Sequence, residues 1–234
     1  TACILKCENS WLTIWFNRPE KRNSLSKILI KEINQSLNFV ENDPSIRGVI
    51  FRGKGNVFCA GADLKWMQSI ASKKSNSSDL AMKMSIEFGE MFKNISNLSK
   101  VTISVVEGAC IAGAVGIVSA TDFLVTTVDA KYALTETRIG LTPAQIAPYI
   151  ISKVGFKIGK KLMLLGNVFN GKDAFSIGMA DYVIHHNDDL ESEVLKIIND
   201  VKKCSPNAIA VTKKVLNSHY NIETSHAAKL FSQC

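Results

Sequence analysis

The sequence predicts an α/β fold in which strands dominate the first half of the chain and helices dominate the second. Short runs of β-branched and aromatic residues, typical of buried strands, occur at residues 11–16, 48–53 and 101–106. Apolar side chains recur at helical spacing over residues 190–203, 206–218 and 222–231. The 234 residues, 46% of them hydrophobic, suffice for one domain or for one domain with a small appendage. We place a boundary near Val168, which divides the chain into residues 1–167 and 168–234.

The other elements are predicted from caps, spacing and helix breakers. Ser26 predicts the N-cap of a helix with apolar residues at helical spacing, and Pro44 predicts its end. A mobile loop rich in Ser, Lys and Asn is expected over residues 71–79. Further helices are expected over residues 80–98, 144–154 and 156–165, followed by a short helix from residue 170 and a strand over residues 181–185. We interpret the apolar side of the helix over residues 80–98 as core.

The central stretch, residues 101–142, carries the strongest functional signal. A strand is followed by a glycine-rich bend over residues 107–116, a helix of small residues, a second strand after Asp122 and a loop that carries Glu136. Such a bend leaves backbone N–H groups unobstructed at the positive end of a helix. We interpret Gly113 as one donor of an oxyanion hole and Glu136 as the acid/base beside it.

A membrane span over residues 101–120 is the rival interpretation of this stretch, because it contains a single charged residue, Glu107. The mid-segment carboxylate, the clustered glycines and the lack of basic flanks favour a buried core instead.

Because the N-terminus has no signal-peptide pattern, we expect a cytoplasmic protein with six reduced cysteines. The cysteines form no Cys-x-x-Cys pair, so we expect no metal site.

The net charge of +7 favours an anionic partner, either nucleic acid or a phosphorylated small molecule, although a surface of solvated lysines explains it equally well. The lysines are scattered, which makes nucleic acid the less favoured partner.

No Walker motif or Gly-x-Ser-x-Gly motif is present, and no histidine lies near Cys59 or Cys110. A second bend of small residues, 58–64, offers further backbone donors. Two donors and one carboxylate suit a thioester enolate, but Glu136 alone could equally be a helix cap or an ion-pair residue.

Four segments, residues 17–25, 58–64, 107–122 and 130–143, stand in the order and spacing of the crotonase (enoyl-CoA hydratase/isomerase) superfamily, which the chain resembles from Trp11 to its last helices. The pattern is most similar to that of methylglutaconyl- and isohexenylglutaconyl-CoA hydratases. The resemblance implies a spiral of ββα turns with a C-terminal helical trimerisation region, residues 168–234. It also implies a homotrimer or a dimer of trimers and an acyl-CoA substrate, with no cofactor beyond the coenzyme A of that substrate.

The resemblance also assigns the site residues. The oxyanion donors would be the backbone N–H groups of Ala62 and Gly113. Coenzyme A would lie along a set of residues from the first two segments: Lys21, Arg22, Leu25, Ala60, Asp63 and Leu64. Lys21 or Arg22 would contact phosphate, although a solvated loop explains both equally, and Asp63 could equally hold the bend.

One departure from the superfamily bears on the reaction. The best-known hydratases have a second glutamate where this chain has Gly116, so Glu136 is the remaining carboxylate. We expect Gly116 to open space and to remove repulsion against a substrate carboxylate, which Arg138 or Gln145 would pair with. The expected activity is therefore hydration of a 2-enoyl-CoA, including a branched glutaconyl-CoA. The alternatives are an enoyl-CoA isomerase, an acyl-CoA decarboxylase, and a non-catalytic acyl-CoA- or RNA-binding relative.

Overall fold

A computed structural model describes residues 1–72, 77–185 and 188–218. Its centre is a six-stranded sheet with the order β1-β2-β3-β4-β6-β9. Only β1 runs antiparallel to its neighbour, and the other described pairs of this sheet are parallel. The strands are β1 (Cys3–Glu8), β2 (Trp11–Phe16), β3 (Gly48–Gly53), β4 (Val101–Val106), β6 (Phe123–Thr127) and β9 (Tyr182–Ile184).

A second, smaller sheet has the order β5-β7-β8 and is formed by β5 (Ala109–Ile111), β7 (Lys131–Ala133) and β8 (Phe169–Asn170). β5 lies inside the glycine-rich bend, and its parallel partner β7 precedes Glu136. These strands of two or three residues were not predicted, because they are too short to show a period of two. The small sheet is what holds the glycine bend beside the segment that carries Glu136.

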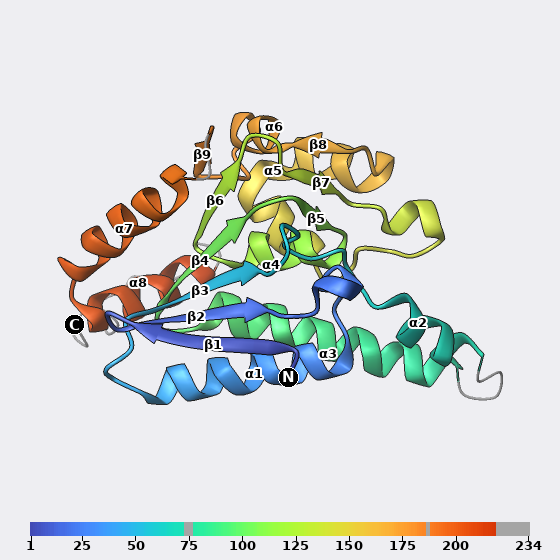
Figure 1. The fold of residues 1–234 in the computed structure, drawn as a ribbon. Coiled ribbons are helices and arrows are strands. Elements are labelled where there is room, and N and C mark those ends of the chain that lie inside the picture. The colour runs from blue at the N-terminus through green and yellow to red at the C-terminus, as the bar shows by residue number, and fades with distance from the viewer. Residues whose placement is uncertain (73–76, 186–187, 219–234) are drawn as a thin grey trace.

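Helices cover both faces of the large sheet (Figure 1). They are α1 (Lys27–Asn42), α2 (Leu64–Ala71), α3 (Ser77–Asn97), α4 (Gly113–Ala120), α5 (Ala147–Leu165), α6 (Gly171–Ser176), α7 (Asp188–Lys202) and α8 (Pro206–Asn217), with 3₁₀ turns η1 (Pro19–Lys21) and η2 (Glu136–Ile139). Alternation along β3 decides which face each helix covers, because successive side chains of a strand point to opposite faces. Phe51 belongs to the core beneath α1, α3 and α4, whereas Ile50 belongs to the core beneath α7.

The longer predicted elements are confirmed. Ser26 caps α1, since its Oγ accepts a hydrogen bond of 3.3 Å from the Leu29 N–H. Gly155, with φ of +74°, interrupts α5 where two helices were predicted to meet. Glu136 lies in a 3₁₀ turn where a loop was expected. The expected helix over residues 222–231 lies outside the described residues, as do residues 73–76 of the expected loop over residues 71–79. The loop is shorter than predicted, because α2 includes Ala71 and α3 begins at Ser77.

The rival interpretation, a membrane-spanning helix over residues 101–120, is excluded, because these residues divide into β4, β5 and α4. Throughout the described part of the chain, no helix combines the length and apolar character needed to cross a bilayer. The boundary near Val168 stays a prediction. β8 and β9 lie beyond it, and they complete the small and the large sheet respectively.

Candidate active site

The first bend, residues 58–63, lies against the loop that precedes α1. The Leu25 N–H donates to the Gly61 carbonyl at 2.8 Å, and the Asp63 N–H donates to the Leu25 carbonyl at 3.0 Å. In extended backbone, successive peptide groups point to opposite sides. The N–H of Ala62, between these two bonds, therefore points away from Leu25. It has no acceptor among the hydrogen bonds of the described residues.

Asp63 holds this bend in place. Its Oδ1 accepts from the N–H groups of Lys65 and Trp66, which caps α2, and its Oδ2 lies 3.2 Å from Nη2 of Arg18. Burial opposes ionisation of this carboxyl, but the Trp66 N–H and the Arg18 guanidinium outweigh it and lower the pKa of Asp63. Asp63 thus has the structural role that the sequence left as one of two alternatives.

The second bend lies directly beside the first. The Cys59 N–H donates to the Ala109 carbonyl and the Ile111 N–H donates to the Cys59 carbonyl, both at 3.0 Å. Gly61 has φ of +86°, and a Cβ built on it would stand 2.9 Å from the Ile111 carbonyl oxygen. A side chain at Gly61 would therefore push the two bends apart.

The second bend ends in a strained residue that turns the chain into α4. Ala112 has φ of +53°, a conformation that costs a non-glycine residue about 1–3 kcal/mol. Gly113 is the first residue of α4, so its N–H has no partner within the helix. A Cβ on Gly113 would lie 3.2 Å from Cδ1 of Leu25. The N–H groups of Ala62 and Gly113 thus belong to two adjacent segments that meet around Leu25.

Glu136 reaches this region through the small sheet. The Ala112 N–H donates to the Ala133 carbonyl at 2.7 Å, which holds the end of β7 against the start of α4, and Glu136 follows three residues later. Its Oε2 is buried and has no hydrogen-bond partner among the described residues. Burial raises the pKa of the Glu136 carboxyl. No ion pair is found for Glu136 within the described residues, whereas its own backbone N–H, at the start of η2, bonds the carboxyl and opposes the rise in its pKa.

The residues assigned to coenzyme A divide into exposed and buried ones. Lys21, Arg22 and Leu64 are exposed around the first bend, and Ala60 is half-buried there. The Ala60 N–H donates to the Arg22 carbonyl at 3.0 Å, which joins the two segments. Leu25 is 0% exposed and both of its backbone groups are bonded, so it supports the two bends and offers no surface to a ligand.

The expectation that Gly116 opens space is wrong. A Cβ on Gly116 would stand 2.3 Å from Cγ2 of Ile146 and 2.9 Å from the Phe92 ring. Apolar side chains therefore already occupy the volume that a larger residue would need.

Arg138 and Gln145 are both engaged within the protein. The Arg138 guanidinium donates to the Leu165 carbonyl at 3.2 Å and to Oδ1 of Asn167 at 2.9 Å. Nε2 of Gln145 donates to Oγ of Ser85 at 3.0 Å. Neither side chain is presented in this structure to pair with a substrate carboxylate.

A row of aromatic residues lies beside α4, and the sequence analysis assigned its members on α3 to the core. It consists of Trp66, Phe88, Phe92 and Tyr149, from α2, α3 and α5. Phe88 and Phe92 have the spacing of one helix face, which is as typical of core as of a pocket wall. Trp66 and Tyr149 had no local signal, because the row forms only when three helices meet.

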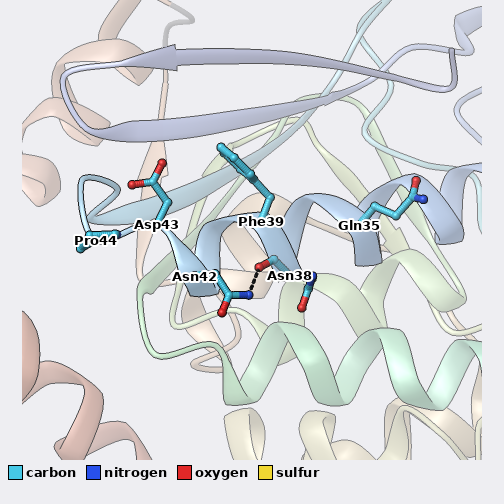
Figure 2. A pocket seen from close by; sticks show the side chains of 6 residues that line it. All are labelled: Gln35, Asn38, Phe39, Asn42, Asp43 and Pro44. Carbon is cyan, nitrogen blue, oxygen red and sulfur yellow. Dashed lines mark hydrogen bonds between the residues drawn. The ribbon is translucent and has the colours of Figure 1, made fainter.

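The cavities found elsewhere are less suited to this chemistry. A cavity of about 510 Å³ lies along α1 and is lined by Gln35, Asn38, Phe39, Asn42, Asp43 and Pro44 (Figure 2). None of these residues belongs to either bend. A second cavity of about 330 Å³ lies between η2 and α5, where Thr137 and Phe156 are among its lining residues. Within residues 1–72, 77–185 and 188–218, no group of three His, Cys, Asp or Glu residues could hold a metal ion.

A mainly parallel sheet with paired backbone-donor bends and a buried carboxylate defines a protein of the crotonase fold. The chain belongs to the enoyl-CoA hydratase/isomerase family, whose model matches residues 6–233. A crystal structure of an enoyl-CoA hydratase/isomerase from Marinobacter aquaeolei is similar, with a TM-score of 0.93 and 32% sequence identity over 99% of this chain and 90% of that one.

Two curated relatives carry different activities in their names. Human mitochondrial methylglutaconyl-CoA hydratase is 27% identical over 217 residues, which cover 91% of this chain and 62% of the relative. The mitochondrial Δ3,5-Δ2,4-dienoyl-CoA isomerase of Dictyostelium discoideum is 31% identical over 207 residues, which cover 86% of this chain and 70% of the relative. Similarity to both hydratases and isomerases leaves the reaction to be argued from the site.

Proposed function

We propose that this protein hydrates 2-enoyl-CoA thioesters through an enolate, with Glu136 as the acid/base and the N–H groups of Ala62 and Gly113 as the oxyanion hole. The observation that carries the proposal is the buried, unpartnered Oε2 of Glu136. A buried carboxyl oxygen without a partner destabilises a fold, and carboxyl groups with a shifted pKa are concentrated at functional sites. The raised pKa of Glu136 suits a group that both accepts and donates a proton near neutral pH.

The reaction uses one carboxylate twice. Glu136 accepts a proton from water while the water oxygen forms a bond to C3 of the enoyl group. The electrons of the C2–C3 double bond move toward C1, and the carbonyl electrons move onto the thioester oxygen, which the two N–H groups stabilise. Glu136 then returns the proton to C2, so that one water is added overall. Loss of one such donor typically costs roughly 3 kcal/mol of transition-state stabilisation.

The first bend supports coenzyme A as the carrier of the acyl group. Lys21 and Arg22 are exposed beside Ala60, and neither forms an ion pair with another described residue. Two unpaired cations close to the proposed thioester site are suited to phosphate groups. The net charge of +7 is consistent with an anionic substrate.

An enoyl-CoA isomerase is the second candidate, and the packing around Gly116 favours it. Because Phe92 and Ile146 fill the space at Gly116, a second carboxylate has no place there. One carboxylate is enough for isomerisation: Glu136 would remove a proton from C2 of a 3-enoyl-CoA and return it to C4, which moves the double bond from C3–C4 to C2–C3. Hydration additionally requires that the same carboxylate orient the water.

Assays of wild type and Glu136→Gln with two substrates distinguish the hydratase, the isomerase and the non-catalytic binding protein from one another. With 2-enoyl-CoA and 3-enoyl-CoA as substrates, we expect the wild type to hydrate the former and the variant to lose about 10²–10⁴-fold in kcat with an unchanged Kd for acyl-CoA. The matched control is Glu193→Gln on α7, a helix whose buried side chains belong to the core on the other face of the large sheet. Turnover of 3-enoyl-CoA without hydration would establish the isomerase. Binding of acyl-CoA with no turnover in wild type would refute both enzymes.

A further inference from the structure

Arg18 is a half-buried cation at the start of the loop that precedes α1. Nη1 of its guanidinium donates to the Ser24 carbonyl at 3.0 Å, and Nη2 donates to Oδ2 of Asp63 at 3.2 Å. The backbone N–H of Arg18 donates to Oδ1 of Asn23 at 2.8 Å, and Asn23 is 0% exposed. The position of the cation is therefore fixed by contacts to both its backbone and its side chain.

Two peptide groups in series connect this guanidinium to the N–H of Ala62. The first joins Ser24 to Leu25, and its carbonyl accepts from Arg18. Its N–H donates to the Gly61 carbonyl at 2.8 Å. That carbonyl belongs to the second peptide group, whose N–H is that of Ala62. Because the C=O and the N–H of a trans peptide group lie in one plane and point in opposite directions, each bond also directs the next donor.

We propose that Arg18 is a positioning residue of the oxyanion hole, which directs and polarises the Ala62 N–H through these two peptide groups. This inference rests on the proposed function for the role of that N–H. A cation at one end of a hydrogen-bond chain makes each successive N–H a stronger donor, because every bond polarises the peptide group that provides the next one. The enolate oxygen would be the last acceptor of the chain.

Asp63 holds the guanidinium at the start of this chain. Its Oδ2 bonds Nη2 while Nη1 bonds the Ser24 carbonyl, a division that the planar fork of an arginine allows. The charge of Arg18 also compensates the Asp63 carboxylate, which directly follows the Ala62 donor in sequence and would otherwise oppose an enolate. Arg18 therefore favours an oxyanion both by geometry and by charge.

The effect of Arg18 is confined to one of the two donors. The peptide group that provides the Gly113 N–H has the carbonyl of Ala112, which accepts from the Val115 N–H at 2.8 Å. Complete loss of one oxyanion donor typically costs about 10²–10³-fold. Loss of Arg18 weakens the Ala62 donor without removing it, so its effect should be smaller than that range.

The ionisation of a bound β-ketoacyl-CoA measures the strength of the oxyanion hole without turnover. Acetoacetyl-CoA loses a proton from C2 to solvent and forms an enolate that absorbs in the near ultraviolet, so absorbance against pH gives the ionisation constant of the bound ligand. We expect Arg18→Gln, which removes the cation, to lower this constant by about 10-fold relative to wild type. Arg18→Lys keeps the charge without the fork and should lower it by about 3-fold.

Two controls separate this effect from a general loss of structure. Arg47→Gln changes an arginine that donates to the Val201 and Cys204 carbonyls at the end of α7, and it should leave the ionisation constant unchanged. S-ethyl-CoA has no thioester carbonyl, so its affinity, measured by calorimetry, should be the same in wild type and in both Arg18 variants.

An unchanged ionisation constant in Arg18→Gln, or in Arg18→Lys if the glutamine variant does not fold, would overturn the proposal. A loss of S-ethyl-CoA affinity equal to the loss of enolate would also overturn it, because Arg18 would then only support the loop. If wild type does not favour the enolate over the free ligand, the assigned oxyanion hole is wrong and the role of Arg18 with it. If hydration fails while Arg18→Gln still weakens the enolate, the proposed reaction is wrong and the role of Arg18 is retained.

Discussion

The carboxyl of Glu136 is held in a state that disfavours its charge. Burial raises its pKa, and its Oε2 has no partner among the described residues. The folded protein therefore binds this proton more tightly than the unfolded chain does. Stability from this group is fully present below the ordinary carboxyl pKa and is lost as the pH rises through the raised folded value.

Glu136→Gln should abolish the loss of folding stability that accompanies ionisation of Glu136 at higher pH, since glutamine does not ionise. We expect the variant to be more stable than wild type at pH 7, by about 1 kcal/mol or less because water still reaches part of the side chain. The difference should disappear near pH 4. Urea unfolding at pH 4, 5.5 and 7 measures it, with Glu193→Gln as the control for removal of a carboxylate. A variant less stable than wild type at pH 7 would mean that the carboxylate makes a stabilising contact.

At the scale of single residues, the sequence predicted which residues are candidates better than it predicted their surroundings. Gly113 and Glu136 could be singled out because a glycine bend and a carboxylate stand in one apolar stretch, and their proposed roles stay predictions. The roles of Arg138 and Gly116 could not be predicted. The partners of Arg138 lie 27 and 29 residues away in sequence, and Gly116 is enclosed by side chains from α3 and from the segment before α5. Neither set of neighbours leaves a local pattern.

At the scale of elements, η2 is fastened to the end of α5. Oγ1 of Thr137 donates to the Met163 carbonyl at 3.1 Å, and Arg138 donates to the Leu165 carbonyl. These carbonyls belong to the last turn of α5, which has no helical partners for them and carries partial negative charge. The turn that begins at Glu136 is thereby held against a long helix.

Arg138→Ala should therefore lower kcat by about 10-fold with little change in KM, because a small displacement of Glu136 weakens proton transfer. The matched control is Arg47→Ala. Arg47 donates in the same way to the Val201 and Cys204 carbonyls at the end of α7, far from the bends. Steady-state kinetics and thermal unfolding of both variants distinguish a displacement of Glu136 from a loss of stability of the whole protein. A higher KM with unchanged kcat in Arg138→Ala would indicate direct contact with substrate.

Elements of five or more residues were predicted well because their periodicity spans several residues. β5, β7 and β8 were missed, although they bring Gly113 and Glu136 together. Their pairing depends on tertiary contacts between segments that are distant in sequence.

At the scale of the whole molecule, an ion pair joins the described C-terminal helix α8 to the central sheet. Nζ of Lys213 in α8 lies 2.6 Å from Oδ2 of Asp122 and 2.9 Å from the Lys100 carbonyl. Burial lowers the pKa of Lys213, and the Asp122 carboxylate opposes this shift. Such a pair links α8 to the start of β6, and removal of either partner would leave an uncompensated charge. A boundary could not be excluded from sequence, because helices that cover a sheet and helices of an appendage have the same amphipathic pattern.

The expected homotrimer can be tested on a surface that the monomer leaves uncovered. Phe156 is 69% exposed, and Ile139, Leu164 and Leu165 are also exposed on η2 and α5 beside the 330 Å³ cavity. Clustered exposed apolar side chains of this kind typically mark a protein interface. We therefore expect sedimentation equilibrium to give three times the chain mass, or six times for a dimer of trimers, and Phe156→Glu to shift the protein toward monomer. Phe39→Glu is the control, because Phe39 is 57% exposed on α1 at the other cavity (Figure 2). If only Phe39→Glu dissociates the assembly, the interface lies along α1, and a monomeric wild type would exclude the trimer altogether.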